Sequence, residues 1–422
     1  MTTRILHVDL DAFFVEVCRQ RHPELRDVDL LVVGGRRDQR GVVQSASYGA
    51  RRYGVHSGMP IARAVRLCPD ATFFQGDFSH YRTASKAVRQ VLLRHSPVVV
   101  MASLDEAYLD FTGTDRLYPR SLLPVAEQIR DEVKEETGLD CSIGVGPNRM
   151  IAKIASELAK PRGLLEVRSG WEEGFMAGLP LRAIPGIGPK TAARLTSLGL
   201  TDVIQIQQLD QTDLERLVPP DQARLLKLRA HGYGGVGLRS RRQPKSISRE
   251  TTLSTDVKDR AGLETTLERL TARVASELRH DALMARTVTL KLRHGDFRTI
   301  TRQRTLTVPT DLDPEIWEAV RGLFRAAFSE VKRRGKGVRL IGVAATNLVP
   351  SAPADLFEAP DRERLRKLTT AVDRARAKYG FNAVTPGSLL GSQRRSARPA
   401  EPSDDHATKG ATESEPGDPP AN

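Results

Sequence analysis

The sequence lacks the features that mark several large classes of protein. No run of about 18 apolar residues occurs along the 422 residues, which argues against a membrane span. The first residues lead directly into a predicted strand and show no secretory signal pattern. Cysteine is scarce and odd in number, and the wide separation of Cys18, Cys68 and Cys141 favours neither a disulfide framework nor a zinc site. We therefore expect a cytoplasmic protein.

Acidic residues are outnumbered, and apolar residues are few. Lys and Arg number 65 against 52 Asp and Glu, which gives a net charge of +13 and a pI near 9.9. This balance favours a polyanionic partner such as nucleic acid, although a basic, solubilising surface would give the same composition. The apolar fraction of 39% is low, and a polar tail accounts for part of that deficit. The length predicts about two to four domains.

The order of the predicted elements divides the chain into three parts and a tail. Strands and helices alternate over residues 1–165, which predicts a mixed α and β domain. Residues 181–235 are typical of helices, and the Gly- and Arg-rich stretch 232–246 predicts a linker. A second domain with a sheet and two helices, the first over 261–284, is expected to follow. After residue 391 the Pro, Ser, Asp and Glu content predicts disorder.

Two groups of carboxylates stand beside apolar runs. Asp9 lies inside a strand predicted over residues 5–10, Asp11 follows it, and Asp105 and Glu106 lie in the turn between two apolar segments. Alternate side chains of a strand share a face, so Asp9 and Asp11 are expected on the face opposite the apolar one. Carboxylates at strand ends can converge on Mg²⁺, and two such ions can hold the attacking and leaving oxygens of a phosphoryl transfer.

A purely structural explanation is available for some of these carboxylates. Asp11 is predicted to cap the following helix, and Asp105 and Glu106 could form a solvated turn. Asp9 has no evident local role, and a buried carboxylate is costly unless something pairs with it. Asp9 therefore points to a site more strongly than its neighbours do.

Other residues could hold the phosphates of a nucleotide. Ser45, Tyr48 and Arg51 follow a predicted strand at helical spacing, so a hydroxyl, a phenol and a guanidinium can share one face. Arginine grips phosphate oxygens in pairs, and Lys160, at the end of a predicted helix, could reach a phosphate as a point charge. Each signal is weak alone, because solvated helix faces commonly carry such residues.

Two segments favour contacts with DNA. The loop of "PGIGPKTAARL", with Gly186, Gly188 and Lys190, offers backbone N–H groups at a helix start and matches the helix–hairpin–helix pattern that binds duplex backbone without reading sequence. A ligand-free helical corner is the alternative. Basic residues also crowd the strands predicted over 286–306, where a basic sheet face would suit sugar–phosphate contacts; they are Arg286, Lys291, Arg293, Arg298, Arg302 and Arg304.

Taken together, these segments resemble the Y-family translesion DNA polymerases, and most closely their DNA polymerase IV (DinB) branch. The resemblance covers roughly residues 4–350, and its motifs occur in order with compatible spacing. The motifs are "HVDLDAFF", "SASYGARRYGVHSGMP", "SLDEAYLDFTG", "GVGPNRMIAKIASELAKPRG", "IPGIGPKTA" and "KSISRETTL".

The resemblance implies an α+β right-hand polymerase with a ferredoxin-like palm, small fingers, a helical thumb with a helix–hairpin–helix, and an α/β little finger. The implied parts are the palm (1–10 and 78–165), fingers (11–77), thumb (166–235), linker (236–245), little finger (246–350), a C-terminal extension (351–390) and a disordered tail (391–422).

The resemblance also implies roles for single residues. Asp9, Asp105 and Glu106 match metal-binding and catalytic carboxylates, with the backbone carbonyl of Leu10 as a further ligand. Ser45, Tyr48, Arg51 and Lys160 match groups around the triphosphate. Phe14 matches a steric gate that excludes the 2′-hydroxyl of ribonucleotides, whereas Phe13 is expected in the core.

The implied activity is template-directed DNA synthesis of low fidelity, without proofreading, past damaged template positions. The implied cofactor is Mg²⁺, two per active site, with Mn²⁺ as a substitute. The implied partners are primer–template DNA and dNTPs, with no membrane partner, and the protein is expected to be monomeric. Polymerases of this type often bind a sliding clamp through a Gln-Leu-x-Leu-Phe-like peptide, and Asp355, Leu356 and Phe357 match it in part without the Gln.

Two rival functions fit part of the pattern. A catalytically inactive homologue could serve as a DNA-binding adaptor in a mutagenesis complex, but such proteins typically lose the carboxylates that this chain keeps. A nucleotide cyclase could share the palm-like core and the two-metal chemistry, but it has no need of a helix–hairpin–helix or a basic little finger. Primer extension separates all three functions.

Overall fold

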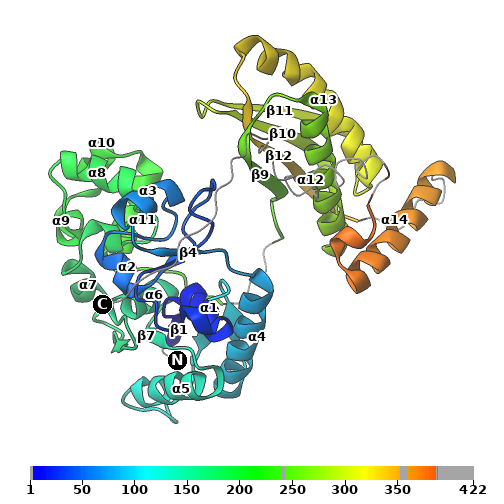
Figure 1. Ribbon diagram of the computed structural model, residues 1–422. Coiled ribbons are helices and arrows are strands. Elements are labelled where there is room, and N and C mark those ends of the chain that lie inside the picture. The colour runs from blue at the N-terminus through cyan, green and yellow to red at the C-terminus, as the bar shows by residue number, and fades with distance from the viewer. Residues whose placement is uncertain (1–2, 239–242, 352–359, 386, 388–422) are drawn as a thin grey trace, which may run out of the picture. The chain divides into compact units, whose positions relative to one another are not determined.

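The chain forms two compact units, shown in Figure 1. Unit 1 spans residues 1–242 and unit 2 spans residues 243–422, so the boundary falls within the stretch 236–245 that was expected to be a linker. None of the described helices is both long and apolar enough to cross a membrane. The computed structural model describes residues 3–238, 243–351, 360–385 and 387.

A five-stranded sheet in the order β5-β6-β1-β7-β8 forms the base of unit 1. β1 lies at its centre and is antiparallel to both neighbours, β6 and β7. This central position buries all six residues of β1. The strands are β1 (Ile5–Leu10), β5 (Val99–Met101), β6 (Glu106–Asp110), β7 (Cys141–Gly146) and β8 (Leu164–Glu166).

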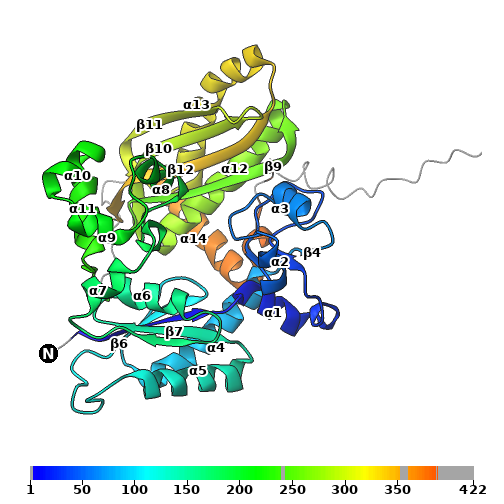
Figure 2. The same cartoon turned by 90° about the vertical axis from the view of Figure 1, so that its left-hand side faces the viewer.

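Helices cover both faces of this sheet (Figure 2). Leu6 and Val8 of β1 share a hydrophobic core with α1 (Phe13–Arg21), α4 (Phe78–His95) and α5 (Leu123–Thr137). His7 and Asp9 point to the opposite face, where α6 (Arg149–Leu158) lies over the sheet. The alternation expected for this strand is therefore confirmed, and it directs polar groups toward α6.

A smaller lobe of unit 1 has its own three-stranded sheet, in the order β3-β2-β4. Its core includes Val32, Ala46, Ala50 and Ile61, which join the sheet to two short helices. The elements of this region are the 3-10 turn η1 (Pro23–Leu25), β2 (Leu31–Val33), β3 (Ser45–Ala46), α2 (Tyr48–Arg52), α3 (Ile61–Leu67) and β4 (Thr72–Phe74).

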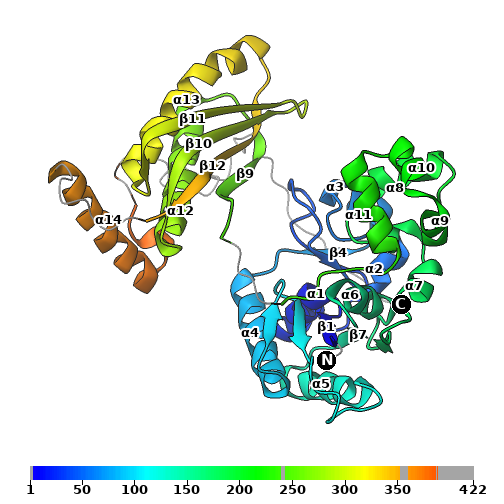
Figure 3. The same ribbon diagram turned by 180° about the vertical axis from the view of Figure 1, so that it is seen from behind.

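The last part of unit 1 is helical, as expected, and Figure 3 shows its helices gathered together. Leu195, Ile206 and Leu214 belong to its core, which also includes Ile151 of α6 and so joins this part to the large sheet. The elements are α7 (Glu172–Ala177), the 3-10 turn η2 (Leu181–Ala183), α8 (Pro189–Ser197), α9 (Val203–Gln208), α10 (Gln211–Leu217) and α11 (Pro220–Ala230).

Unit 2 contains a four-stranded antiparallel sheet in the order β11-β10-β12-β9. Two long helices, α12 and α13, pack on one face of it (Figures 1 and 3). A further helix, α14, lies against them. The elements are β9 (Ser246–Val257), α12 (Arg260–His280), β10 (Leu283–His294), β11 (Thr299–Thr310), α13 (Asp313–Arg334), β12 (Val338–Pro350), α14 (Pro360–Tyr379) and the 3-10 turn η3 (Phe381–Ala383).

In unit 2 the structure corrects the end of one predicted helix and adds a strand and a helix. The helix expected over 261–284 ends at His280, because Ala282 adopts a left-handed conformation (φ 52°) and Leu283 and Met284 join β10 opposite β12. β9 and α14 were not anticipated. The tail expected to be disordered, 391–422, lies outside the described residues.

Candidate active site

A cleft of about 360 Å³ in unit 1 gathers most of the predicted site residues. It opens where the large sheet, the start of α1 and the smaller lobe meet. Of the residues expected to bind metal, nucleotide or sugar, only Tyr48 is missing from its lining. The lining includes Asp9, Leu10, Phe14, Ser45, Arg51, Asp105, Glu106 and Lys160.

Strand register explains why the carboxylates meet. Asp9 lies directly opposite Glu106 on the neighbouring strand β6. Directly opposed residues of an antiparallel pair project from the same face at close range. The backbone N–H of Leu10 donates to the carbonyl of Asp105 at 2.9 Å, which brings the turn before β6 to the end of β1. Residues about a hundred positions apart thus converge on one edge of the sheet.

Asp9 is a buried carboxylate with a lysine partner. Its carboxylate lies 3.0 Å from Nζ of Lys160, which is also 2.6 Å from Glu157. Burial raises the pKa of Asp9 to about 6 despite the opposing effect of Lys160. One shared lysine therefore does not fully compensate the charge of Asp9, and a further cation in the cleft would favour its ionised form.

Glu106 is more strongly held in its ionised form. Its Oε1 lies 2.6 Å from Nζ of Lys153, and its Oε2 lies 3.5 Å from Nε2 of His7. His7 and Lys153 lower the pKa of Glu106 to about 2. Asp105 is half-buried, and its carboxylate accepts a hydrogen bond from the hydroxyl of Ser103.

The donor set suits a hard divalent cation. Three carboxylates line one cleft, and carboxylate oxygen is the ligand that Mg²⁺ prefers. Within the described ranges, no three Asp, Glu, His or Cys groups already stand together as ligands of one ion. Lysines pair with Asp9 and Glu106 instead. The residue types therefore fit a site for a divalent cation.

Asp11 is not a helix cap, so that prediction was wrong. The chain turns through a left-handed conformation at Ala12 (φ 46°), and Ala12 itself occupies the cap position of α1. The buried carboxylate of Asp11 instead accepts hydrogen bonds from the hydroxyls of Tyr48 and Ser142 and from the backbone N–H of Arg162. Asp11 therefore ties three distant segments together beside the cleft.

The smaller lobe contributes Ser45 and Arg51 to the cleft. Arg51 donates from Nε to the carbonyl of Ala46 at 3.0 Å, and its guanidinium lies 4.9 Å from the ring centre of Tyr48. Burial raises the pKa of Tyr48 to about 12, and its hydroxyl donates to Asp11 at 3.2 Å. Tyr48 thus orients Arg51 from outside the cleft lining.

The two phenylalanines differ as expected in burial. Phe13 is 1% exposed and belongs to the core, so its expected packing role is confirmed. Both residues border the cleft, but Phe14 is the more exposed of the two and packs edge-on against Tyr81, with ring centres 4.7 Å apart. A bulky ring therefore stands beside the carboxylates, held from behind by a second ring.

The glycine hairpin lies between η2 and α8. Gly186 has a positive φ of 94°, a conformation that side chains with Cβ rarely adopt, and Gly188 caps α8. Lys190 is exposed in the first turn of α8. A guanidinium N–H of Arg229 donates to the carbonyl of Pro185 and so fixes the hairpin from behind. The backbone N–H groups of the hairpin and the side chain of Lys190 are therefore suited to binding an anion.

The basic residues of unit 2 do not share one sheet face, which corrects the expectation of a single basic face. Lys291 and Arg293 alternate with the buried Leu290 and Leu292 and so lie on the face away from the helices. Arg302 is paired with Leu290 and contacts Glu330 of α13 at 3.0 Å, so it lies on the helix side.

The same strand register sets the positions of the other basic residues that were expected to contact DNA. Arg304 lies opposite the buried Val288, on the helix side of the sheet. Arg298 lies in the turn just before β11, and the exposed Arg286 lies in β10. Lys291 also lies 2.7 Å from Glu250 of β9. The open face is therefore less basic than the sequence indicated.

Several residues of the site were not predicted from the sequence. His7, Lys153 and Glu157 contact the carboxylates or Lys160 directly, and His56 lines the cleft. The spacing of Lys153 and Glu157 on one face of α6, with Lys160 just beyond its end, was a usable signal, because residues four apart share a helix face. His7 could have been found from its place on the polar face of β1.

Family models match most of the chain. The impB/mucB/samB family model matches residues 8–157, and the model of its C-terminal domain matches residues 244–356. The IMS family HHH motif matches residues 172–200, which include the glycine hairpin. The three matches together span both units.

Known relatives align with this chain over nearly their whole length. DNA polymerase IV of Caulobacter vibrioides is 38% identical over 391 residues, 92% of this chain and 94% of that protein. DNA polymerase IV of Methanoculleus marisnigri is 41% identical over 347 residues, 82% of this chain and 94% of the relative.

Solved structures place the fold in the same family. A Y-family DNA polymerase chimera of Dbh and Dpo4 matches with a TM-score of 0.72 and 26% identity, over 82% of this chain and 100% of the chimera. DinB from Sulfolobus solfataricus, also 26% identical and with the same coverage, matches with a TM-score of 0.53. The right-hand architecture expected from the sequence is therefore confirmed. The chain belongs to the Y-family of translesion DNA polymerases, in the DNA polymerase IV branch.

Proposed function

We propose that the cleft is the nucleotidyl-transfer site of this polymerase. The primer 3′-hydroxyl attacks the α-phosphate of an incoming dNTP, and pyrophosphate leaves. Synthesis is of low fidelity and lacks proofreading. The observation that supports this assignment is the convergence of Asp9, Asp105 and Glu106 with two cations, Arg51 and Lys160, around one cleft.

The carboxylates of Asp9, Asp105 and Glu106, with the carbonyl of Leu10, would hold two Mg²⁺ ions, for which Mn²⁺ can substitute. Bound there, the ions would neutralise charge on the attacking and leaving oxygens. The buried Asp9, with its raised pKa and single shared lysine, is suited to binding such an ion.

The chain's own cations and hydroxyls bind and orient the triphosphate. Lys160, which pairs with Asp9 and lines the cleft, would contact phosphate oxygens. Arg51 is held in place by Ala46 and Tyr48, and Ser45 offers a hydroxyl from the end of β3. Orientation by fixed groups supplies much of the rate of such transfers.

Phe14 is proposed as the steric gate under the sugar. Its ring lines the cleft beside the carboxylates and is supported by Tyr81. A 2′-hydroxyl would meet this ring, so deoxynucleotides are selected over ribonucleotides.

DNA contacts are proposed for both units. Gly186, Gly188 and Lys190 are suited to duplex backbone in unit 1. In unit 2, the open-face residues Lys291 and Arg293 are stronger candidates than Arg302, which lies on the helix side of the sheet. Arg298 and Arg304 complete the proposed set. Each phosphate contact should contribute about 0.9 to the slope of log affinity against log salt.

A sliding clamp is proposed as a partner through Asp355, Leu356 and Phe357, which lie outside the described residues. Deleting 355–357 should abolish stimulation of primer extension by the clamp, and undiminished stimulation would contradict this role. We propose further that the protein acts as a cytoplasmic monomer.

Primer extension with dNTPs and Mg²⁺ tests the active-site assignment. Asp105→Asn should reduce extension by about a thousandfold while DNA binding persists, because it removes a proposed ligand and no DNA-facing cation. Asp110→Asn is the matched control, since Asp110 lies at the other end of β6 and its carboxylate accepts a hydrogen bond from the N–H of Thr112. Equal activity in the two variants would refute the assignment.

A further inference from the structure

One fully buried polar side chain beside the carboxylates has no role so far. His7 lies in β1, two residues before Asp9 and on the same face, and its side chain is 0% exposed. Its ring packs against Tyr108 of β6, with centres 4.5 Å apart. Register places Tyr108 directly opposite His7, just as Glu106 lies opposite Asp9.

One nitrogen of the ring is anchored to α6. Nδ1 of His7 lies 2.6 Å from the hydroxyl of Ser156, which is itself fully buried. Ser156 is one turn beyond Lys153, the lysine that pairs with Glu106. The anchor therefore comes from the same helix face that supplies the counter-ion of Glu106.

The other nitrogen points at Glu106. Nε2 is buried and makes no hydrogen bond in the described part of the chain, and its nearest charged group is Oε2 of Glu106 at 3.5 Å. A bare lone pair facing a carboxylate would be repelled, so the proton belongs on Nε2. The hydroxyl of Ser156 then donates its single proton to Nδ1. That proton is no longer available for the backbone carbonyl of Lys153, which lies 2.8 Å from the hydroxyl.

We propose that His7, oriented by Ser156, is a positioning residue for Glu106. It directs an N–H at Oε2 and so fixes the rotation of the carboxylate while Oε1 exchanges Lys153 for a divalent cation. This inference rests on the proposed role of Glu106 as a metal ligand. Partners that orient a ligand in this way typically change metal affinity by about 10–100-fold when removed.

A packing role alone would predict something different. If His7 only filled space against Tyr108, any side chain of similar size would serve. Substitution of His7 would then lower thermal stability and leave the affinity for Mn²⁺ unchanged. Two amides separate the possibilities, because the Asn amide can reach Ser156 but not Glu106, whereas the Gln amide extends to the position of Nε2.

The test measures binding of Mn²⁺ to the full chain, with a dideoxy-terminated primer–template and the next dNTP, by the electron paramagnetic resonance of free Mn²⁺. His7→Asn and Ser156→Ala should weaken Mn²⁺ binding by about tenfold, whereas His7→Gln should stay within about twofold of wild type. Thermal denaturation of each variant reports on folding.

The outcomes are distinct. Wild-type Mn²⁺ affinity in folded His7→Asn overturns the proposal, and so does equal weakening in His7→Asn and His7→Gln. If His7→Asn does not fold, Ser156→Ala decides alone, and its unchanged affinity would overturn the proposal. Glu106→Gln is the separate control: if it binds Mn²⁺ as tightly as wild type, the ligand role of Glu106 fails, independently of His7.

Discussion

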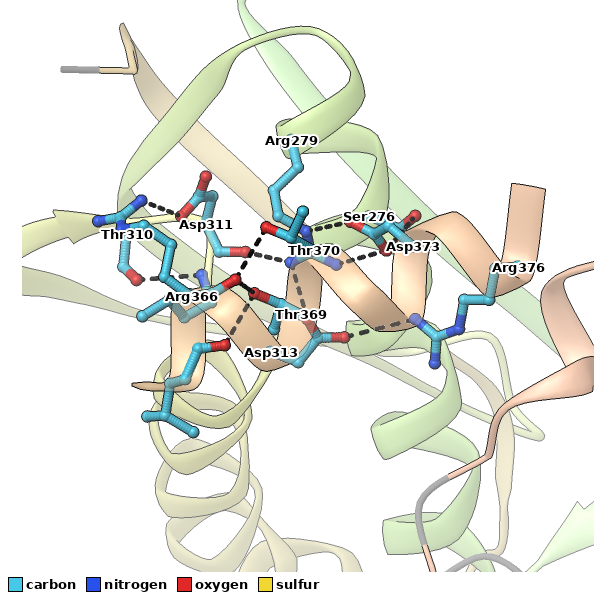
Figure 4. Close-up of polar contacts among 12 residues, drawn as sticks. Ser276, Arg279, Thr310, Asp311, Asp313, Arg366, Thr369, Thr370, Asp373 and Arg376 are labelled. Carbon is cyan, nitrogen blue, oxygen red and sulfur yellow. Dashed lines mark hydrogen bonds and ion pairs between the residues drawn. The ribbon is translucent and has the colours of Figure 1, made fainter. Parts of the chain in front are cut away.

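Two clusters of buried charge, one in each unit, are built in opposite ways. In unit 1, Asp9 and Glu106 each depend on a lysine at the edge of a cleft. In unit 2, charged residues of α12, α13 and α14 neutralise one another within the fold, as Figure 4 shows. Both clusters line a cavity, but the charge of Asp9 in the first is only partly compensated, whereas the charges of the second are paired with one another.

Arg279 is the centre of the unit 2 cluster. Its guanidinium contacts Asp373 of α14 at 2.5 Å, Asp313 of α13 at 2.7 Å and the carbonyl of Asp311 (Figure 4). Burial alone would lower the pKa of Arg279, but Asp373 and Asp313 raise it. Arg376 approaches Asp313 from the other side, at 3.8 Å. Every charge in this group thus has a partner of opposite sign.

The comparison teaches how a fold separates stability from function. Buried charge that serves stability is compensated within the fold, because each uncompensated ion costs several kcal/mol. Buried charge that serves binding is left partly compensated. Burial raises the pKa of both Asp9 and Asp313, but Asp313 has two arginine partners, whereas Asp9 has one lysine that it shares with Glu157. Substitutions of Arg279, Asp9 and Arg362 test this difference, and a substitution of Phe14 tests the cleft beside the first cluster; their expected effects run from the largest to the smallest.

Arg279→Ala should destabilise unit 2 by about 3 kcal/mol, because Arg279 is itself only 12% exposed and its loss leaves two half-buried carboxylates without their main partner. Unfolding of unit 2 can be followed by Trp317 fluorescence in a Trp171→Phe background, since these are the two tryptophans of the chain. Arg269→Ala on the exposed side of α12 is the control. Equal stability of the two variants would show that the ion pairs of Arg279 do not stabilise unit 2.

Phe14→Ala should raise the ratio of ribonucleotide to deoxynucleotide incorporation by about tenfold or more, because it removes the ring that a 2′-hydroxyl would meet. Single-nucleotide extension with each substrate gives the ratio. Phe13→Leu should lower the melting temperature and leave the ratio unchanged, since Phe13 lies in the core. An unchanged ratio in Phe14→Ala would show that sugar selection lies elsewhere.

Asp9→Asn should stabilise metal-free unit 1 by about 1 kcal/mol at pH 8, at the cost of activity. The folded-state pKa of about 6 exceeds the ordinary value of 3.8, so the folded wild type binds the proton more tightly. Its stability therefore falls as pH rises from about 4 to about 6, a loss that Asn avoids. Denaturation with EDTA, followed by Trp171, should show no advantage at pH 4; a destabilised variant at pH 8 would contradict this expectation.

Arg362→Gln should cost unit 2 only about 0.5 kcal/mol, because the Arg362–Glu315 pair is partly solvated, at 24% and 34% side-chain exposure. The loss should shrink in 0.5 M salt, about the range where exposed pairs are screened. The Trp317 assay measures both values. A cost close to that of Arg279→Ala would show that burial does not decide the strength of these pairs.

Local patterns predicted much of the fold. The polar–apolar alternation in β1 placed Asp9 on the correct face of the strand. The cleft lining was largely found because its motifs are short and contiguous. Such features depend on neighbours in the sequence, so the sequence alone reveals them.

Long-range partners explain the errors. Asp11 looks like a helix cap until Ser142 and Arg162, far along the chain, are placed against it. Arg302 and Lys291 look equivalent until the register of β10 and β11 separates them. α14 has few apolar residues, and the ion pairs that hold it involve residues up to 94 positions away. None of these contacts leaves a periodic signal.

The arginines on β11 have a consequence for the solubility of unit 2. β11 is an edge strand, and an unpaired strand edge invites pairing with another molecule. Arg302 and Arg304 place charge on its helix side, where a docking strand would bury it. Replacing them with apolar residues would therefore expose the edge to aggregation as well as remove positive charge. Lysine substitutions at these two positions would keep the edge protected.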